Sequence, residues 1–298
     1  MTNYLTYLHL LTPLHTGGSS QEGNLMGIAR EVHTEFPYLP ASSLRGKIRS
    51  ELENSENPDV AKQASTFFGQ KIQDGQQPTE GEVWFADATL LFFPIASLSH
   101  HLVWVTCPLW LERWNRWLEA KPLTPLISKC RANFSDKKSN KSALVSFNSE
   151  ELYLQTALLN RDDLEQLDHS TLSERLEPLI SSGDIINQLL NKLVILTDED
   201  CVALVETGLQ REVRVALEDQ QKTVKGGSFR SEEAIPPEAV LFFPWGMKSA
   251  KEADKTDKIR IQTLDILNNR LQFGGLEGLG RGWTDLKTVV IKKKKEAE

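Results

Sequence analysis

The sequence predicts an α+β fold whose central part is a ferredoxin-like (RRM-like) palm with long insertions. Apolar runs typical of strands alternate with helical patterns in the order strand, helix, strand, and this order recurs near the end of the chain. The 298 residues, 40% hydrophobic and 25% charged, can bury a sizeable core. A third observation is an acid-rich internal stretch, which indicates a lobe outside that core.

The first half of the chain predicts a strand, a long loop and a helix. The run YLTYLHLLTPLHTGG alternates in polarity and breaks at Gly17 and Gly18, and a polar loop continues to about Pro40. The next run, SSLRGKIRSELE, has helical periodicity with an apolar face of Leu44, Ile48 and Leu52. Ser42 or Ser43 is expected to cap this helix, which leaves Arg45 and Arg49 together on another side.

Two further strands and a short helix are expected after that helix. GEVWFADATLLFFPI and LVWVTCPLWL are strand candidates because apolar and β-branched residues dominate them. LERWNRWLEA predicts a helix with Trp114 and Trp117 packed inward. These elements give a palm over residues 1–125 and 192–298, interrupted by an inserted helical lobe over 126–191.

The second palm segment is expected to carry a projecting hairpin, which we call the thumb. KLVILTDEDCVALVETG predicts a strand and a helix capped by Thr197. Two extended runs then flank DQQKTVKGGS, whose paired glycines suit a hairpin or flexible arm. The thumb therefore covers about residues 211–240.

Charge is segregated along the chain, although the net charge is -7. Residues 150–206 hold 13 acidic and 3 basic residues, a balance of 3 - 13 = -10, so the remainder is near +3. Basic residues gather at 129–141, 211–230 and 281–298. Binding to phosphates depends on Lys and Arg, so these segments are candidate contacts, although a solvated surface would look the same.

The chain has no recognisable targeting or membrane segment. Its longest apolar run contains Pro94 and is too short to span a bilayer, and the first residues lack the basic start of a signal peptide. The three cysteines show no metal or redox spacing, so we expect reduced thiols and a cytoplasmic protein without a membrane partner.

Catalytic motifs are few. His15 and His33 could act as acid and base on an RNA phosphodiester, although a strand-end histidine and an exposed loop histidine explain them equally well. No zinc-type histidine spacing is present, so no metal ligand is assigned. The segment FGGLEGLGRGW holds five glycines, but no long helix follows, so it does not fit a nucleotide-binding fingerprint.

Several separated blocks resemble one protein family in the same order along the chain. TPLHTGG, HTEFPYLPASSLRG, GEVWFADATLLFFPIASL, VWVTCP, LTDED, EEAIPPE and FGGLEGLGRGW are similar to the backbone subunits of type III-B CRISPR effector complexes. These are repeat-associated mysterious proteins, or RAMPs, of the fourth Cmr and seventh Cas families. The resemblance spans essentially the whole chain, and HTEFPYLPASSLRG and GGLEGLGRGW are its specific parts.

The resemblance implies a hand-like subunit that stacks with further copies of itself along a CRISPR guide RNA. Guide RNA, target RNA and other Cmr or type III Cas subunits are then the expected partners. The glycine-rich segment would bend beside the guide, because glycine permits close approach of a backbone. The implied RNA contacts are Ser42, Ser43, Arg45, Lys47 and Arg49 on the palm helix, Arg211, Arg214, Lys222, Lys225 and Arg230 on the thumb, and Gly274, Gly275, Gly280 and Arg281.

The sequence departs from the family at the catalytic position. Family members are implied to cleave target RNA with a divalent metal and a loop aspartate shortly before an Arg-Glu pair. Here that segment is EGNLMGIARE, which lacks aspartate; Asn24 takes the position if one inserted residue is allowed, and Leu25 takes it otherwise. An amide can neither act as a base nor hold a cation as a carboxylate does. Impaired cleavage is therefore expected, with Mg2+ or another divalent cation needed only if cleavage occurs.

Three other interpretations of the sequence remain open at this point. Glu22 or Glu31 could replace the missing carboxylate, or Asn24 could be an engineered substitution. Alternatively, the chain could be a metal-independent RAMP endoribonuclease that processes guide RNA with His15 or His33. A non-nucleic-acid assembly protein, with the acidic lobe as its interaction surface, is the third possibility.

Overall fold

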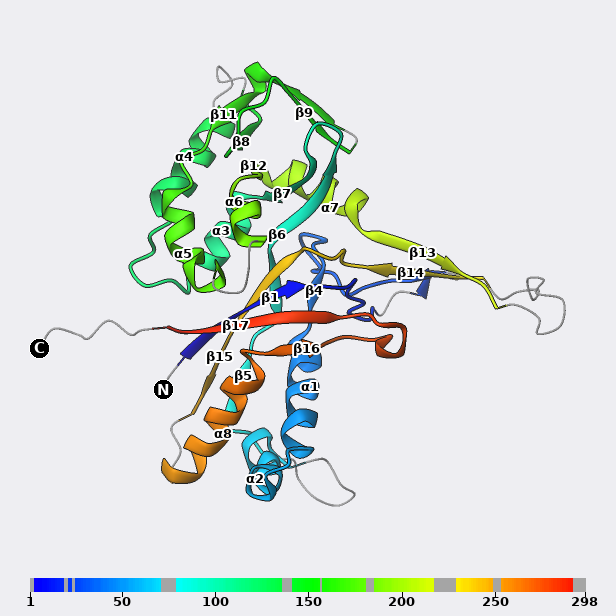
Figure 1. Cartoon of the computed structure of the whole chain (residues 1–298), viewed down its shortest axis with the longest axis vertical. Helices are drawn as coiled ribbons and strands as arrows, with labels where there is room; N and C mark the ends of the chain where they lie inside the picture. Colours follow the sequence, from blue (N-terminus) through cyan, green and yellow to red (C-terminus); the bar gives the residue numbers. More distant parts are fainter. Residues whose placement is uncertain are drawn as a thin grey trace, which may run out of the picture.

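The computed structural model describes most of the chain and leaves ten gaps. The residues described are 3–18, 21–22, 25–70, 79–135, 141–155, 157–180, 185–216, 229–248 and 253–291. The protein has a mixed α+β fold, as the sequence predicted, in which a large sheet carries helices on its face and a hairpin at its side (Figure 1).

Among the described residues, one sheet of eleven strands organises the fold. Its centre has the order β6 (Ala88–Ser97), β15 (Val240–Met247), β1 (Asn3–Leu10) and β17 (Trp283–Ile291), and all three pairings are antiparallel. β16 (Arg270–Gln272) continues the sheet beyond β17. Two short strands pair off this path, β4 (Tyr38–Leu39) with β6 and β5 (Val83–Phe85) with β15. The first and last described strands therefore lie side by side.

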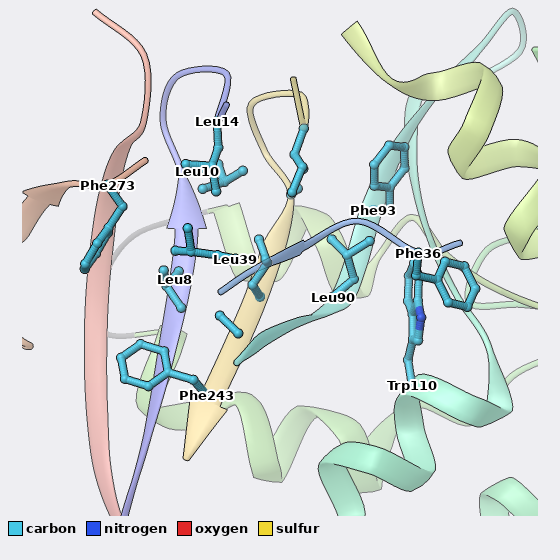
Figure 2. Close-up of a cluster of buried hydrophobic side chains, with 14 of the residues drawn as sticks. Leu8, Leu10, Leu14, Phe36, Leu39, Leu90, Phe93, Trp110, Phe243 and Phe273 are labelled. Carbon is cyan, nitrogen blue, oxygen red and sulfur yellow. The ribbon is translucent and has the colours of Figure 1, made fainter. Parts of the chain in front are cut away.

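Three helices gather at one end of these central strands (Figure 1). They are α1 (Ala41–Glu53), α2 (Pro58–Phe68) and α8 (Ala253–Ile266). Leu44, Ile48 and Leu52 of α1 are buried, so the predicted apolar face is confirmed. Figure 2 shows the apolar cluster behind them, in which the Phe36 ring meets Trp110 edge-on with centroids 4.8 Å apart.

The predicted cap of α1 is wrong. The helix begins at Ala41, before both serines, with Pro40 at the N-cap position and no side-chain cap within the helix. The Ala41 N–H instead donates to Asp87 Oδ1 at 2.7 Å. A carboxylate from the β5–β6 connection thus satisfies the first amide, and sequence pattern could not reveal that partner.

The other end of the sheet extends into the lobe. β7 (His101–Thr106), β12 (Leu193–Leu196), β8 (Ala143–Val145) and β11 (Leu164–Gln166) follow one another beside β6. The helices of this region are α3 (Pro108–Asn115), α4 (Thr124–Ser135), α5 (Ser170–Ile180) and α6 (Ile185–Leu190). A separate strand pair is formed by β9 (Glu151–Leu154) and β10 (Ala157–Asn160). The short turn η1 (Arg161–Asp163) follows β10.

Residues 126–191, predicted to be helical, therefore contain strands as well as helices. The short strand β8 pairs antiparallel with β12 and parallel with β11. These two neighbours supply the backbone hydrogen-bond partners that an isolated three-residue strand would lack. Leu144 belongs to a second buried cluster that also contains Trp104 and Trp114. Trp114 is fully buried as predicted, whereas Trp117 follows α3 and is only partly buried.

The thumb strands project sideways from the palm (Figure 1). β13 (Gln210–Arg214) pairs antiparallel with β14 (Arg230–Ala234), and the connection over 217–228 lies outside the described residues. β14 also pairs in parallel with β3 (Leu25–Met26), which pairs with β2 (Gln21–Glu22). α7 (Asp198–Gly208) precedes the thumb, and Thr197 accepts from Asp200 N at 3.0 Å, which confirms its predicted cap.

The three cysteines are free and buried, in agreement with the expected reduced thiols. Among the helices that the structure describes, none combines the length and the apolar character needed to cross a membrane.

Candidate nucleic-acid interface

The palm helix α1 carries the first group of predicted RNA contacts. Arg45 points into the protein, where its guanidinium donates to the carbonyl oxygens of Val83, at 3.0 Å, and Phe68. It also lies 5.1 Å from the centre of the Phe68 ring. Burial, followed by the charge of Arg49, lowers the pKa of Arg45. Arg45 is therefore engaged between α1, α2 and β5.

The remaining polar residues of α1 lie nearer the surface. Arg49 pairs with Glu53 at 2.8 Å, and Lys47 pairs with Glu51 at 3.1 Å, both one helical turn apart. Ser42 is exposed and Ser43 is half-buried. Both pairs are partly buried, with 17% of the Arg49 side chain and 24% of the Lys47 side chain exposed, so a phosphate would have to compete with the carboxylates for these cations.

The glycine-rich segment forms a tight turn, η2 (Glu277–Leu279), between β16 and β17. Gly274 and Gly282 have φ of 83° and 80°, and a Cβ at either would overlap a backbone oxygen, that of His15 or of Phe273. Gly280 also has positive φ, 76°, but its Cβ would meet nothing. Two of the glycines are thus required by contacts within the chain itself.

The glycine-rich turn and α1 lie beside each other, although 230 residues of sequence separate them. Lys47 Nζ is 3.7 Å from Glu277 Oε1, which links the helix to η2. Gly275 N donates to His15 O at 2.8 Å, which links the turn to the end of the first strand. An ion pair therefore joins α1 to the glycine-rich turn, and a backbone hydrogen bond joins the turn to the end of the first strand.

Arginines and glutamates gather where the thumb leaves the palm. We call this cluster the thumb root, and its members are Arg30, Arg211, Arg214, Arg281, Glu206, Glu212, Glu232 and Glu233. Three of its arginines were predicted to contact RNA. Its carboxylates come from α7, β13 and β14, and Arg30 and Arg281 come from the segment after β3 and the residues before β17, so the cluster joins five parts of the chain.

The most buried member is Glu233, whose side chain is 3% exposed. Its Oε1 accepts from Arg30 Nη2 at 2.9 Å and from Arg211 Nη2 at 3.1 Å. Burial lowers the pKa of both arginines, but hydrogen bonds to Glu206 and Glu233 outweigh it, so both pKa values are raised. The two glutamates therefore stabilise the charged forms of Arg30 and Arg211.

Arg281, predicted to meet a phosphate, points into the thumb root with only 6% of its side chain exposed. Its Nη2 lies 2.7 Å from Glu212 Oε2 and 3.7 Å from Glu232 Oε2. Arg214 Nε is also 2.9 Å from Glu232 Oε2, although without hydrogen-bond alignment. Burial alone would raise the pKa of Glu212. The charge of Arg281 and hydrogen bonds from Gln210 and Arg281 outweigh burial, so the pKa of Glu212 is lowered.

The two histidines considered for acid-base chemistry lie in different settings. His15 is 5% exposed, and its Nδ1 lies 2.8 Å from the backbone oxygen of Glu233. His33 is exposed in the turn that follows Glu31. His15 thus connects the first strand to β14, which is the strand-end role that the sequence left open.

The segment with the catalytic family position is fixed on both sides. Asn24 itself lies outside the described residues, but β3 begins at the next residue and pairs with β14. After β3, Arg30 reaches the thumb root, and Glu31 accepts from Arg113 at 2.6 and 2.8 Å. Within the described part of the chain, no three His, Cys, Asp or Glu residues are placed to hold a metal ion.

Lys222 and Lys225 also lie outside the described residues. Phe229 and Arg230 are described and exposed, at the start of β14. Sequence reasoning missed Arg30, Glu206, Glu232 and Glu233, although the alternation of charge in REVR and RSEE was a signal that charged residues share one face of the hairpin.

The fold agrees with comparisons to known proteins. The family model of the RAMP superfamily matches residues 7–285, so the chain belongs to the RAMP superfamily. The CRISPR system Cmr endoribonuclease Cmr4 of Pyrococcus furiosus is 28% identical over 292 residues, covering 95% of this chain and 94% of that protein. The CRISPR system CMR subunit Cmr4 of Saccharolobus solfataricus is 24% identical over 305 residues.

Solved structures of Cmr proteins have the same fold as this chain. A chain of the type III-B Cmr-beta complex bound to cognate target RNA has a TM-score of 0.72 with 22% identity over 96% of both chains. Oligomeric Cmr4 from Pyrococcus furiosus has a TM-score of 0.67 with 22% identity, over 98% of this chain and 100% of that one. The resemblance to type III-B backbone subunits is therefore confirmed.

Proposed function

We propose that this protein is an RNA-binding backbone subunit of a type III CRISPR effector, which stacks along guide RNA and holds target RNA. The observation that carries the proposal is the meeting of α1 with the glycine-rich turn through Lys47 and Glu277. The helix α1 begins in one family-specific segment and the turn lies in the other, whose Arg281 reaches the thumb root. Partners of the proposed assembly are guide RNA, target RNA, further copies of this chain and other Cmr or type III Cas subunits.

The proposed palm is ferredoxin-like and spans residues 1–125 and 192–298, with 126–191 as the inserted lobe. The elements β1, α1, β6, β15, α8 and β17 support it, because the two strand-helix-strand units interleave in the sheet order β17, β1, β15, β6. Such a palm offers a continuous surface when copies stack, so basic residues of successive subunits align along one strand of RNA.

The candidate guide contacts differ in how readily they can meet a phosphate. Ser42, Ser43, Lys47 and Arg49 lie at or near the surface of α1, and the helix N-terminus adds favourable dipoles. Arg211 is half-exposed in the thumb root, whereas Arg45 and Arg281 are held inside the protein. In the proposed interface, the last two shape the surface on which the others bind RNA.

Target cleavage is proposed to be impaired, because Asn24 stands where the family has its aspartate. Mg2+ or another divalent cation would be required only for cleavage, and Glu31 is already committed to Arg113. The burial of His15 gives no support to a metal-independent nuclease. We expect Asn24→Asp to raise Mg2+-dependent cleavage of a labelled target by about a hundredfold in the assembled complex, which EDTA would abolish.

The first test of RNA binding is purification of the chain followed by sequencing of the RNA bound to it. Repeat-derived guide RNA would support the proposal. RNA-free protein that also fails to bind guide RNA with its sister subunits would instead favour an assembly protein. Vigorous cleavage in EDTA that His15→Ala or His33→Ala abolishes would favour the histidine nuclease.

A further inference from the structure

A hollow of about 490 Å3 lies at the end of α3. Its volume falls within the range of roughly 300–1,000 Å3 that is typical of small-ligand sites. Its walls come from α3 and the two residues after it, from the β5–β6 connection and from strands β6 and β15. The lining residues are Ala86, Asp87, Thr89, Arg113, Arg116, Trp117, Phe242 and Pro244.

One part of the hollow is apolar and aromatic. Trp117, Phe242 and Pro244 line it, and the Trp117 ring lies 6.2 Å from that of Trp84 at 33°. Trp117 remains partly exposed, so one partner ring supports it while part of its surface stays accessible. A partly exposed indole is a suitable platform for a nucleobase, because every base has a π face that can stack on it.

The other part of the hollow carries positive charge. Arg113 is fixed by its two hydrogen bonds to Glu31, whereas the exposed Arg116 has no ion-pair partner among the described residues. The predicted RNA-binding arginines Arg49, Arg211 and Arg281 all have carboxylate partners. Arg116 can therefore accept a phosphate without first losing an internal ion pair.

The hollow also adjoins the proposed guide surface. Asp87 lines it and accepts from Ala41 N, the first residue of α1. The Asp87 carboxylate repels phosphate but can accept hydrogen bonds from a base edge, and Thr89 adds a hydroxyl. This arrangement orients an occupant, with its phosphate toward Arg116 and its base between Trp117 and Asp87.

We infer that this hollow binds one nucleotide of single-stranded RNA, with the base stacked on Trp117 and the adjoining phosphate paired with Arg116. The inference rests on the proposed function, because RNA bound to α1 brings a nucleotide to this edge of the helix. Stacking alone accepts any base, so the site contributes affinity and register without strong sequence preference.

The test is photo-crosslinking of the purified full chain to single-stranded RNA that carries 5-bromouridine, with the attachment point mapped by mass spectrometry. We expect a crosslink on Trp117. Trp117→Leu should remove it and weaken binding about tenfold, the usual order for one stacked base. Arg116→Ala should lower the logarithmic salt slope by about 0.7, as expected for one lost contact to a single strand.

Arg175→Ala is the matched control, because Arg175 is an exposed arginine on α5 that does not line the hollow and has no described ion-pair partner. If RNA binds without a crosslink on Trp117, and Arg116→Ala and Arg175→Ala have equal effects, nucleotide binding in the hollow is refuted. The proposed function would be left intact. A change of oligomeric state in Trp117→Leu, with unchanged RNA binding, would assign the hollow to a second copy. Complete absence of RNA binding, both by the chain alone and together with its sister subunits, would refute both proposals.

Discussion

The palm core and the thumb root are both buried, but opposite kinds of interaction hold them. In the core, Trp110, Phe243 and Trp245 are fully buried among other apolar side chains. In the thumb root, Glu233, Glu232 and Arg281 are almost as inaccessible, yet they carry charge. The core gains from any apolar contact, whereas the thumb root depends on each charge having its partner.

This difference changes the meaning of a basic residue in a candidate RNA-binding protein. A cluster of arginines in the sequence suggests a surface for phosphates, but Arg281 and Arg211 are paired with carboxylates that occupy the same donors. The thumb root therefore fixes the hairpin and the segment after β3 on the palm. The contrast between the two regions can be tested by removing single side chains from each.

The largest effect is expected in the core. Trp110→Ala removes a fully buried ring that packs on Phe36, so we expect the free energy of unfolding to fall by about 3–5 kcal/mol. Chemical denaturation measures this loss. Trp110→Phe should cost much less, because the buried Trp110 Nε1 has no hydrogen-bond partner to lose. Equal losses in the two variants would contradict an account based on packed volume.

An intermediate effect is expected in the thumb root. Glu233→Gln removes the charge shared by Arg30 and Arg211, so the free energy of unfolding should fall by about 1–3 kcal/mol. Hydrogen exchange should increase at β3 and β13. Glu150→Gln is the control, since Glu150 is 77% exposed in its pair with Arg161 and should change stability by less than about 0.5 kcal/mol. Similar exchange in both variants would refute the anchoring role.

The smallest effects separate two neighbouring arginines of α1. Arg45→Ala leaves carbonyls of Val83 and Phe68 without a donor and should cost about 1–2 kcal/mol of stability. Arg49→Ala breaks only its pair with Glu53 and should cost at most about 0.5 kcal/mol. Guide binding should respond in the opposite order, with a reduced salt slope for Arg49→Ala. A reduced slope for Arg45→Ala alone, at unchanged stability, would reverse the assignment.

Local pattern predicted the strands and helices well wherever their own residues carry the signal. The apolar face of α1 and the cap at Thr197 are both found in the structure. The cap of α1 was missed because its acceptor, Asp87, comes from a segment 46 residues away. The strands within 126–191 were missed because they are short and depend on partners that only the folded sheet provides.

The sequence by itself determined the family and the alternation of strands and helices, because motif order and hydrophobic period are properties of the linear chain. It also led to the prediction that Asn24 stands where the family has an aspartate. Only the tertiary structure decided which charges are free. Arg281 and Arg116 are indistinguishable as letters, but one meets Glu212 inside the thumb root and the other lies exposed beside a hollow. Ion pairing depends on distance in space, and distance along the chain does not encode it.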